Sequence, residues 1–480
     1  MNALHDPVQA PEPVLSTLNV DGSRRWIRPR RSSGPWWRRR LVAAWALIAL
    51  FVAIPYLKVG GHPALLLDLP RREFWLLGAP FRASDTLLFM LLFLTVMLGI
   101  LVVTALFGRV WCGWACPQTV YMEFVFRPLE RWLEGGWRGS RKLDRHRRHL
   151  HPRRVAKVAL YAVLSLFLAH TFLAYFVPVE ELARWMTRPP AEHPTSFALV
   201  MLVAAMILVD FTWFREQTCL VACPYGRFQS ALLDRRSLIV GYDARRGEPR
   251  SKEILARPAG AGDCVDCRLC VLTCPTGIDI RQGLQMECIH CTQCMDACDA
   301  VMTRFGRPRG LIRYGSQDAF EGRAGRALRP RLVVYPIAFA VALGLFAWML
   351  ATRPDAEVTL LRGLGAPYTV DRDGGVVNQV RIRVANRGAH DRRFEIALEN
   401  AAGARLVAPV NPLPVAAGRT GTASVFVVSP PVGFEHGERT VTLRLADGAG
   451  FERAFAWRLL GPEADEDGTE ARAPGGEAGR

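Results

Sequence analysis

The sequence predicts a membrane protein with five transmembrane helices, a cysteine-rich segment between the fourth and fifth helices, and an all-β domain after the fifth. Three observations support this fold class. Half of the 480 residues are apolar although the net charge is +17, several apolar stretches approach membrane-spanning length, and all 12 cysteines fall in short-spaced groups before residue 299. A nucleic-acid-binding protein would also be basic, but here the basic residues flank the apolar stretches, as they do in membrane proteins.

Five apolar stretches are long enough, or nearly so, to cross a hydrocarbon core about 30 Å thick, which takes about 20 helical residues. The first is the shortest, but we do not interpret it as a signal peptide, because an arginine-rich leader precedes it and no small-residue cleavage site follows. We expect a basic N-terminal segment over 1–40 and a four-helix membrane domain over 41–214. The predicted spans are 41–57, 86–108, 156–177, 196–214 and 332–351.

Basic residues are unevenly distributed between these spans. The N-terminal segment and the connections 109–155 and 215–331 are rich in arginine, whereas 58–85 and 178–195 carry few basic residues. Because basic loops stay on the cytoplasmic side, we expect the N-terminus inside and the C-terminus outside. This orientation places all 12 cysteines in the cytoplasm. The basic stretch 138–154 is also a candidate for contact with anionic lipid headgroups.

Short alternating apolar runs, separated by Gly, Pro, Asn and Asp, begin after residue 355. About seven such runs over roughly 100 residues predict an all-β sandwich of immunoglobulin type at 356–460. We expect the acidic tail 461–480 to be disordered.

Eight cysteines form two consecutive CxxCxxCxxxC runs. This spacing lets three thiolates of one run surround a 4Fe–4S cluster while the fourth reaches the cluster of the other run, as in two-cluster ferredoxins. We therefore expect a ferredoxin-type domain at about 255–305, within the cytoplasmic region 215–331. The first predicted ligand set is Cys264, Cys267, Cys270 and Cys298, and the second is Cys274, Cys288, Cys291 and Cys294.

A pair of zinc sites is the alternative for these eight cysteines. Zinc sites usually combine two CxxC pairs across a longer gap or include histidine, so the spacing favours iron–sulfur clusters. Asp299 stands in the second run where the first run has Pro275, but this difference removes no ligand.

The other four cysteines form two CxxxCP motifs, each following a pair of spans. The repeat suggests a pseudo-symmetric bundle whose thiols converge, and cysteines four residues apart on a helix share one face. The thiols suit Cu(I), zinc or an iron–sulfur cluster, or a dithiol–disulfide relay. They could instead be buried cysteines that pack as small apolar side chains. The candidate catalytic or metal-binding residues are Cys112, Cys116, Cys219 and Cys223.

Weaker candidates lie within or near the spans. Asp210 and His170 are ionisable residues at membrane depth, where function is the default hypothesis, although Asp210 is close enough to the inner end of its helix to reach water. Four methionines offer thioethers to copper, but their helical spacing favours packing. They are Met90, Met97, Met201 and Met206.

Several long stretches resemble the FixG/CcoG/RdxA family, the cytochrome c oxidase accessory proteins. The resemblance covers nearly the whole chain, from the first span to about residue 460, and the family also shows an aspartate at the position of Asp299. The matching stretches are GRVWCGWACPQTVYMEF (108–124), CPYGRFQ (223–229), YDARRGEPR (242–250), the eight-cysteine segment (264–299) and GLIRYGS (310–316).

This resemblance implies a protein of the bacterial inner membrane that assists assembly of cbb3-type cytochrome oxidase by reducing Cu(II) to Cu(I) in the cytoplasm. It implies two 4Fe–4S clusters, copper or a third cluster at the CxxxCP thiols, and a periplasmic immunoglobulin-like domain. The expected partners are oxidase assembly factors or a copper transporter or chaperone, an unknown electron donor, membrane lipids and, in a homodimer, a second copy of the chain. No nucleic acid is expected.

Two other functions remain open. One is a quinol-linked electron-transfer subunit, similar to the membrane ferredoxins of nitrate and nitrous oxide respiration, which share the twin CxxxCP hairpins. The β domain favours the oxidase-assembly family over this alternative. The other is a non-enzymatic scaffold whose β domain binds the assembling oxidase.

Overall fold

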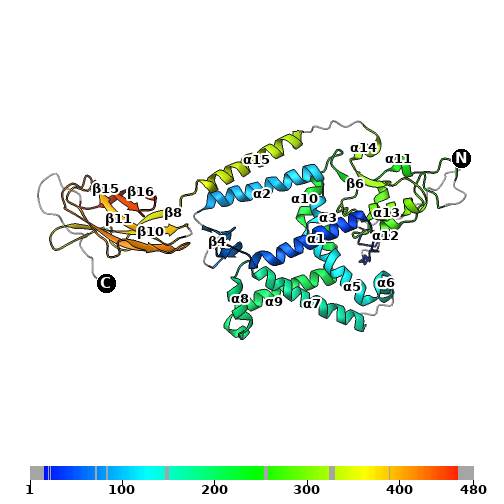
Figure 1. Cartoon of the computed structure of the whole chain (residues 1–480), viewed down its shortest axis with the longest axis horizontal. Coiled ribbons are helices and arrows are strands. Elements are labelled where there is room, and N and C mark those ends of the chain that lie inside the picture. The colour runs from blue at the N-terminus through cyan, green and yellow to red at the C-terminus, as the bar shows by residue number, and fades with distance from the viewer. Residues whose placement is uncertain are drawn as a thin grey trace. The chain divides into compact units, whose positions relative to one another are not determined.

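The computed structural model divides the chain into two compact units, Met1–Trp348 and Met349–Arg480, and each is described by itself (Figure 1). The predicted disordered tail beyond residue 462, the first 15 residues and part of the basic stretch 138–154 lie outside the described residues. The structure describes residues 16–19, 21, 23–70, 73–82, 85–145, 151–252, 258–323, 330–388 and 390–462.

Five helices in the described residues are long and apolar enough to cross a membrane, which confirms the predicted spans. Four of them begin with proline, whose fixed φ and missing N–H suit the first helical turn. The first helix begins earlier than predicted. Its first turns contain the arginines at 38–40, which a search for apolar stretches leaves out of the span. The five are α1 (Pro35–Ala53), α2 (Thr86–Phe107), α7 (Pro152–Leu173), α9 (Pro194–Val209) and α15 (Pro330–Ala351).

The connections on the side predicted to face outward contain short strands that the sequence analysis missed. β1 pairs with β2, and β3, β4 and β5 form an antiparallel sheet. The turn between β4 and β5 has positive φ at both Leu77 and Gly78, as a tight hairpin requires, but leucine is an unusual residue there. The elements are η1 (Ile54–Tyr56), β1 (Lys58–Val59), β2 (His62–Pro63), β3 (Leu65–Asp68), β4 (Glu73–Leu76), β5 (Ala79–Arg82), α8 (Val179–Met186) and η3 (Pro190–Glu192).

The connections on the other side contain short helices and one two-stranded sheet. In this sheet β6, which precedes the cysteine-rich domain, pairs with β7, which follows it. Three helical segments, η2, η4 and η5, are π-helical, a form that is frequent at functional sites. The elements are α3 (Val110–Trp114), α4 (Pro117–Tyr121), η2 (Met122–Phe126), α5 (Arg127–Glu134), α6 (Gly136–Arg145), η4 (Asp210–Phe214), η5 (Thr218–Ala222), α10 (Pro224–Leu232), β6 (Ile239–Tyr242), α11 (Ala244–Gly247), α12 (Leu269–Thr273), η6 (Ile280–Gln282), α13 (Gln293–Arg304), β7 (Ile312–Gly315) and α14 (Gln317–Glu321).

The N-terminal segment lies against the cysteine-rich domain before it enters α1. The backbone N–H of Arg30 donates to the carbonyl of Leu272 over 2.8 Å. The carboxylate of Asp296 in α13 accepts from the backbone N–H groups of Trp36 and Trp37, at 3.2 and 2.7 Å. These are orphan donors at the start of α1, so α13 supplies its N-terminal cap from a distant part of the sequence. The first membrane helix is thereby fixed to the cysteine-rich domain.

The second unit consists of two antiparallel sheets, which confirms the predicted immunoglobulin-like sandwich. One sheet has the order β12-β14-β10-β8 with β9 on β10, and the other has the order β13-β11-β15-β16. The described residues of this unit contain nine strands where about seven were expected, and three of the nine have only two or three residues, too few to show periodicity. They are β8 (Ala356–Arg362), β9 (Thr369–Val370), β10 (Val376–Asn386), β11 (Arg392–Glu399), β12 (Arg405–Val407), β13 (Leu413–Val415), β14 (Thr420–Ser429), β15 (Glu438–Ala446) and β16 (Glu452–Leu460).

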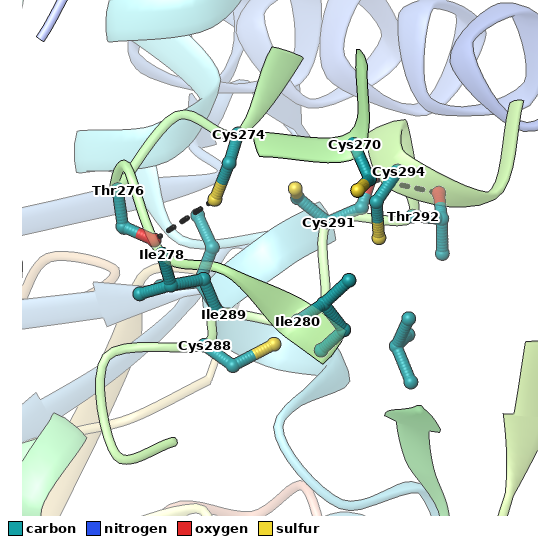
Figure 2. Close-up of a pocket in the computed structure, with 11 residues that line it drawn as sticks. Cys270, Cys274, Thr276, Ile278, Ile280, Cys288, Ile289, Cys291, Thr292 and Cys294 are labelled. Atoms are coloured by element: carbon teal, nitrogen blue, oxygen red, sulfur yellow. Dashed lines mark hydrogen bonds between the residues drawn. The ribbon is translucent and has the colours of Figure 1, made fainter. Parts of the chain in front are cut away.

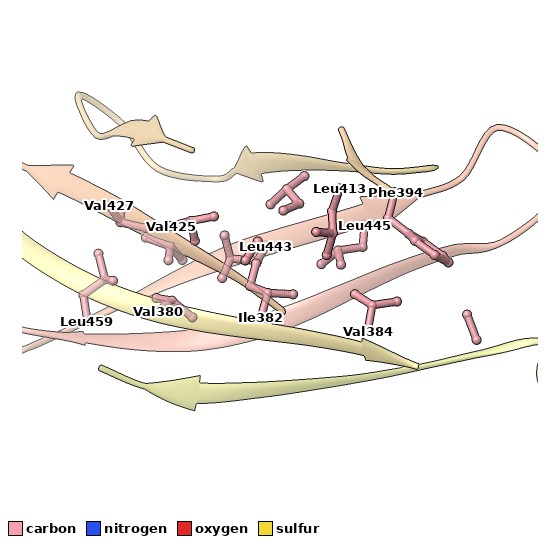
Figure 3. Packing of buried hydrophobic residues seen from close by; sticks show 14 of the residues in the cluster. Val380, Ile382, Val384, Phe394, Leu413, Val425, Val427, Leu443, Leu445 and Leu459 are labelled. Carbon is pink, nitrogen blue, oxygen red and sulfur yellow. The ribbon is translucent and has the colours of Figure 1, made fainter. Parts of the chain in front are cut away.

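Alternate residues of the long strands fill the space between the two sheets (Figure 3). Val380 and Ile382 of β10 are fully buried, as are Leu443 and Leu445 of β15. Burial of each such aliphatic side chain contributes about 1.5–3 kcal/mol. The described part of this unit therefore has its own apolar core.

Candidate functional site

The two CxxCxxCxxxC runs adopt the same loop conformation. In each run, the second and fourth residues after the first cysteine have positive φ: 45° and 55° at Asp266 and Arg268, and 53° and 60° at His290 and Thr292. Left-handed residues at these places turn successive N–H groups toward one side, forming the kind of backbone concavity that binds anions and many iron–sulfur clusters. Backbone strain at four non-glycine residues is unusual. Because the strain recurs at the same two positions of both loops, it indicates that the two loops serve the same function.

The cysteines line two cavities, one for each loop. We call the space lined by Cys264, Cys267, Cys270 and Cys298 the first cavity. The second cavity is lined by Cys274, Cys288, Cys291 and Cys294 and also by Cys270, which lines both cavities, and Figure 2 shows these sulfur atoms around one space. The structure thus brings the last cysteine of each run to the cavity of the other run. The crossed ligand sets depend on this arrangement and themselves remain a prediction.

The donor chemistry of both cavities fits a cluster better than a single ion. Among the described residues, no three His, Cys, Asp or Glu side chains converge tightly enough to hold one metal ion. A cubane, by contrast, distributes its four thiolates over four separate irons. Burial raises the pKa of Cys270, Cys288 and Cys291 to about 12. Binding of iron therefore has to displace their protons.

The structure corrects the prediction that each CxxxCP pair lies on one helical face. Cys112 is within α3, but Cys116 has an extended backbone, with φ −60° and ψ 125°. Cys219 is likewise within η5, and Cys223 is extended. Each second cysteine precedes a proline, and the proline ring disfavours helical backbone at the preceding residue. The helix therefore ends between the two cysteines of each motif.

The four CxxxCP thiols nevertheless lie close together, as the repeat led us to expect. Burial, together with the nearby Cys116, Cys112 and Cys223, raises the pKa of Cys219 to about 12. The Cys112 thiol donates to Oε1 of Gln229 over 3.0 Å. Gln229 is fully buried, and its amide donates to the hydroxyls of Thr104 and Tyr225, at 3.0 and 2.6 Å. These hydrogen bonds fix the orientation of its amide. Sequence reasoning did not single out Gln229, which lies at the end of the CPYGRFQ stretch.

Helix α3 touches the loop of the second cavity, and we call this contact the junction. Cys112 and Tyr225 pack in one apolar cluster with Ile289 and Cys291. A Cβ added at Gly113 would lie 2.5 Å from the carbonyl oxygen of Ile289. Glycine at this place is what allows the CxxxCP thiols to approach the second cavity so closely. Sequence reasoning missed this contact.

Three buried polar side chains at the junction have unpartnered atoms. Arg40 is fully buried and leaves both terminal guanidinium nitrogens without a partner, and Nε of Arg109 and Nε2 of His290 are also unpartnered within the described structure. The other ring nitrogen of His290 accepts from the backbone N–H of Arg109 over 3.3 Å. Burial, with Arg109 nearby, lowers the pKa of His290 to about 3, so its imidazole is neutral. Orphaned buried donors indicate an acceptor that protein atoms do not supply.

A buried ionic network joins the membrane domain to the N-terminal segment. The carboxylate of Glu130 is bound by Arg28, by Lys157 at 3.1 Å and by Arg215 at 2.9 Å. Glu123 and Arg127 form a second pair, which reaches the cysteine-rich domain. Arg127 donates to the carbonyl of Pro275 at 3.1 Å, and Gln293 donates to Glu123 at 2.9 Å.

We expect Glu130→Gln to destabilise the protein by about 3–5 kcal/mol, because three buried cations would lose their shared carboxylate. Burial alone would raise the pKa of Glu130, but Arg215, Arg28 and Lys157 hold it well below 4.5. Its contribution is therefore complete above pH 4.5 and is lost as the pH falls through this lowered value. Thermal unfolding in detergent at neutral pH measures the loss. Glu192→Gln, which breaks an exposed pair, is the control and should cost less than about 1 kcal/mol; equal effects of the two changes would contradict the prediction.

The weaker candidates are not brought into the site. Asp210 accepts a hydrogen bond from Thr218 at the C-terminal end of α9. His170 Nδ1 lies 2.8 Å from the carbonyl oxygen of Leu166, on the other side of the membrane domain. The expected packing of the four methionines is not observed, since the structure leaves each of them at least 39% exposed on its helix. They are Met90, Met97, Met201 and Met206.

Three family models match the chain. One is a 4Fe–4S dicluster domain over residues 214–317, and another is a 4Fe–4S binding domain over residues 89–138. The third is an immunoglobulin-like fold at the C-terminus of FixG, over residues 346–462. Ten of the 12 cysteines lie in the first match and the other two in the second.

Curated relatives match over most of the chain. Protein RdxA of Cereibacter sphaeroides is 33% identical over 447 residues, which cover 89% of this chain and 92% of the relative. Nitrogen fixation protein FixG of Rhizobium meliloti is 32% identical and covers 78% of this chain and 79% of its own length. Protein RdxB of Cereibacter sphaeroides is 31% identical, with coverage of 87% and 91%.

Proposed function

Because the chain belongs to the FixG/RdxA family of membrane iron–sulfur electron-transfer proteins, we propose that it reduces Cu(II) to Cu(I) for the assembly of cbb3-type cytochrome oxidase. The 4Fe–4S clusters supply one-electron chemistry when bound. Each Cu(II) ion gains one electron, and the protein loses one. The CxxxCP thiols are the proposed place of this reduction.

The junction is the observation that carries this proposal. Cys112 of the first CxxxCP motif belongs to the same apolar cluster as Cys291, which lines the second cavity. No separate carrier is needed between the two groups, because their side chains belong to one apolar cluster. The short contact between Gly113 and Ile289 holds helix α3 in this position. An electron in the second cavity is thus close to Cys112, the one of the four thiols that belongs to this cluster.

The four thiols also suit the metal. Cysteine sulfur is a soft ligand that prefers Cu(I) to harder ions, so a site of this kind favours the reduced product over Cu(II). The Gln229 amide keeps Cys112 oriented toward its neighbours through its hydrogen bond. Copper is written here as the substrate, which binds and leaves, and not as a resident cofactor.

Electrons are proposed to enter at the first cavity. Cys267 is exposed, whereas Cys288 and Cys291 of the second cavity are buried. A soluble one-electron carrier could therefore approach the first cavity more closely. The order of transfer is then from the first cavity to the second, and from there to the CxxxCP thiols.

A quinol-linked function is the second candidate, and one cavity favours it. A space of about 270 Å³ between α7, α8 and α9 has an apolar lining that includes His170, Trp185 and His193. It lies at the start of α9, whereas Cys219 follows the end of that span, about 30 Å away for a 21-residue helix. No cysteine lies along α9 between this cavity and Cys219, so the helix offers no thiol to pass an electron from a quinol to the CxxxCP site. Copper reduction therefore remains the leading proposal.

The orientation and partners also belong to this proposal. The arginine-rich connections favour cytoplasmic cysteines and a periplasmic β domain in a bacterial inner membrane. The proposed partners are an oxidase assembly factor or a copper transporter or chaperone, together with the electron donor, anionic lipids at 138–154 and a second copy of the chain. A purely structural scaffold would instead support oxidase maturation without its clusters.

We expect the Cys112→Ser/Cys219→Ser variant to lose Cu(II) reduction while keeping its iron and sulfide. The full-length protein is reduced anaerobically, freed of excess reductant and mixed with Cu(II), and Cu(I) is counted with a chelator. Val221→Ser is the matched control, because it changes an exposed residue within the second motif and removes no thiol. Equal Cu(I) yields from the two variants would overturn the proposal. Reduction of the clusters by a quinol, with no Cu(I) formed, would favour the second candidate.

A further inference from the structure

The loop of the first cavity opens to the surface at Cys267. This cysteine is exposed, whereas the other seven cysteines of the two CxxCxxCxxxC runs are buried or half-buried. Arg268, the next residue, lines the same cavity, and its side chain is 68% exposed. A partner protein that approaches this part of the surface therefore meets a cavity thiol directly, with a cation beside it.

Asp266 lies in the same loop and is surrounded by three cations. Its carboxylate binds the buried Arg281 at 2.5 Å, and the charged groups of Lys252 and Arg268 lie 3.7 and 3.9 Å from it. Arg281 also binds Asp279 at 2.5 Å, so three cations share two carboxylates. The Asp266 side chain is 17% exposed, whereas that of Lys252 is 77% exposed. The cations are therefore both in excess and outermost.

A second carboxylate of this loop is also outnumbered by cations. Asp263 precedes Cys264 and is bound by Arg246 at 2.6 Å and by Arg307. Two arginines for one carboxylate leave a positive charge over, as at Asp266. We call the four cations that lie on these two carboxylates and are not buried the basic rim: Arg246, Lys252, Arg268 and Arg307.

The loop of the second cavity has no such rim. His290 and Thr292 occupy the positions that Asp266 and Arg268 have in the first loop, and both are fully buried. The side chains that are exposed just before the second loop carry no charge; they are Gln282, Leu284 and Met286. The basic rim is therefore a property of the first loop and not of the repeated motif.

Membrane topology does not account for the basic rim. Basic residues act as topology signals within about 15–20 residues of a span. The rim begins at Arg246, 32 residues after the span that ends at Phe214, and it ends at Arg307, 23 residues before the span that begins at Pro330. Cations that lie outside these limits and surround an exposed cavity thiol indicate a negatively charged partner that exchanges electrons there.

We propose that the basic rim is the docking surface for an acidic one-electron carrier protein, which is the electron donor. Opposite charges speed the association of two proteins and orient them, so the rim would turn the carrier toward Cys267. One electron leaves the carrier, which is oxidised, and enters the protein at the first cavity, which is reduced, with no proton or bond exchanged. The inference rests on the proposed entry of electrons at this cavity and adds the chemistry of the donor.

Binding of a plant-type 2Fe–2S ferredoxin, an acidic carrier of this kind, tests the docking surface without electron transfer. Oxidised ferredoxin is titrated calorimetrically into the full-length protein in uncharged detergent. We expect binding at low salt and an affinity that falls about tenfold or more as the ionic strength rises from about 0.01 to about 1 M, because the screening length shrinks from about 30 to about 3 Å. No binding at low salt, or an affinity that salt does not change, would overturn the proposal.

Lys252→Glu/Arg268→Glu should weaken ferredoxin binding about tenfold or more at low salt, because electrostatic steering contributes at least this factor. Arg405→Glu/Arg453→Glu is the matched control, since it makes the same change in net charge at two exposed residues of the second unit. The control should bind as the wild type does. Equal weakening in both variants would show that only net charge matters, and the proposal would be wrong. Lys252→Gln/Arg268→Gln, a milder change, should give a smaller loss in the same direction.

Reduction by a small cation separates docking from the clusters themselves. The methyl viologen radical is positively charged, so it should reduce Lys252→Glu/Arg268→Glu at least as fast as the wild type, whereas reduced ferredoxin should react more slowly with the variant. Equal slowing with both donors would place the effect at the clusters and overturn the docking surface. These assays contain no Cu(II). A wild type that methyl viologen reduces but ferredoxin does not bind would therefore refute the donor surface and leave the proposed copper reduction in place.

Discussion

Cys298→Ala should lower the iron content from about eight atoms per chain to about four, as expected for loss of one of two 4Fe–4S clusters. The cluster lost should be that of the first cavity, although Cys298 belongs to the second run. Cys298 lines the first cavity with Cys264, Cys267 and Cys270, whereas Cys288, Cys291 and Cys294 line the second. Iron and sulfide analysis of the anaerobically purified variant measures the loss.

Double variants identify which cluster has gone. Cys267→Ala/Cys298→Ala changes two residues of one cavity, so it should lose no more iron than either single change. Cys291→Ala/Cys298→Ala changes one residue in each cavity and should lose both clusters, because independent sites add while shared sites do not. The reverse pattern would show that each run holds its own cluster, contrary to the crossed ligand sets.

Gly113→Ala should slow electron transfer from the clusters to Cu(II) while leaving both clusters in place. Its new Cβ would lie 2.5 Å from the carbonyl oxygen of Ile289 and 2.9 Å from backbone atoms of His290, so helix α3 or the loop has to move. Overpacking of this kind costs about 1–3 kcal/mol. The docked arrangement should therefore be disfavoured by about a factor of 5 to 150. Stopped-flow re-oxidation of the reduced clusters by Cu(II) gives the rate.

Gly344→Ala is the matched control for this change. Gly344 is also helical, and a Cβ there would meet no atom within 4 Å. Both changes replace glycine by a better helix former, so any difference between them comes from the junction contact. If Gly113→Ala and Gly344→Ala react with Cu(II) at the same rate, the junction is not on the electron route.

The sequence predicts those features of the fold that depend on local pattern. Spans follow from hydropathy, and the ferredoxin loops follow from cysteine spacing. The helical face expected for Cys112 and Cys116 was wrong because Pro117 imposes an extended backbone on the residue before it. That restriction is local and could have been applied to the sequence. The short strands β9, β12 and β13 could not be predicted, because two or three residues are too few to show the alternation of apolar and polar residues that marks a strand.

The site depended more on contacts between distant residues. The junction brings Cys112 to Cys291, and no pattern in the sequence measures a distance between segments so far apart. Arg40 is the last of three consecutive arginines, and no pattern in the sequence distinguishes it from Arg38 and Arg39. What distinguishes it is the docking of α1 on α13, which the Asp296 cap fixes. Gly113 carried a signal, since glycine within a short helix often marks a close backbone approach, but its partner was not evident.

A single-turnover reaction of the fully reduced protein with Cu(II) tests electron transfer to the CxxxCP thiols most directly. The clusters and the Cu(I) product are followed together, anaerobically, in the wild type and in Cys112→Ser/Cys219→Ser. Each electron lost by the wild-type clusters should appear as one Cu(I). In the variant the clusters should remain reduced. Clusters that are re-oxidised by Cu(II) equally fast in the variant would contradict the proposed route through these thiols.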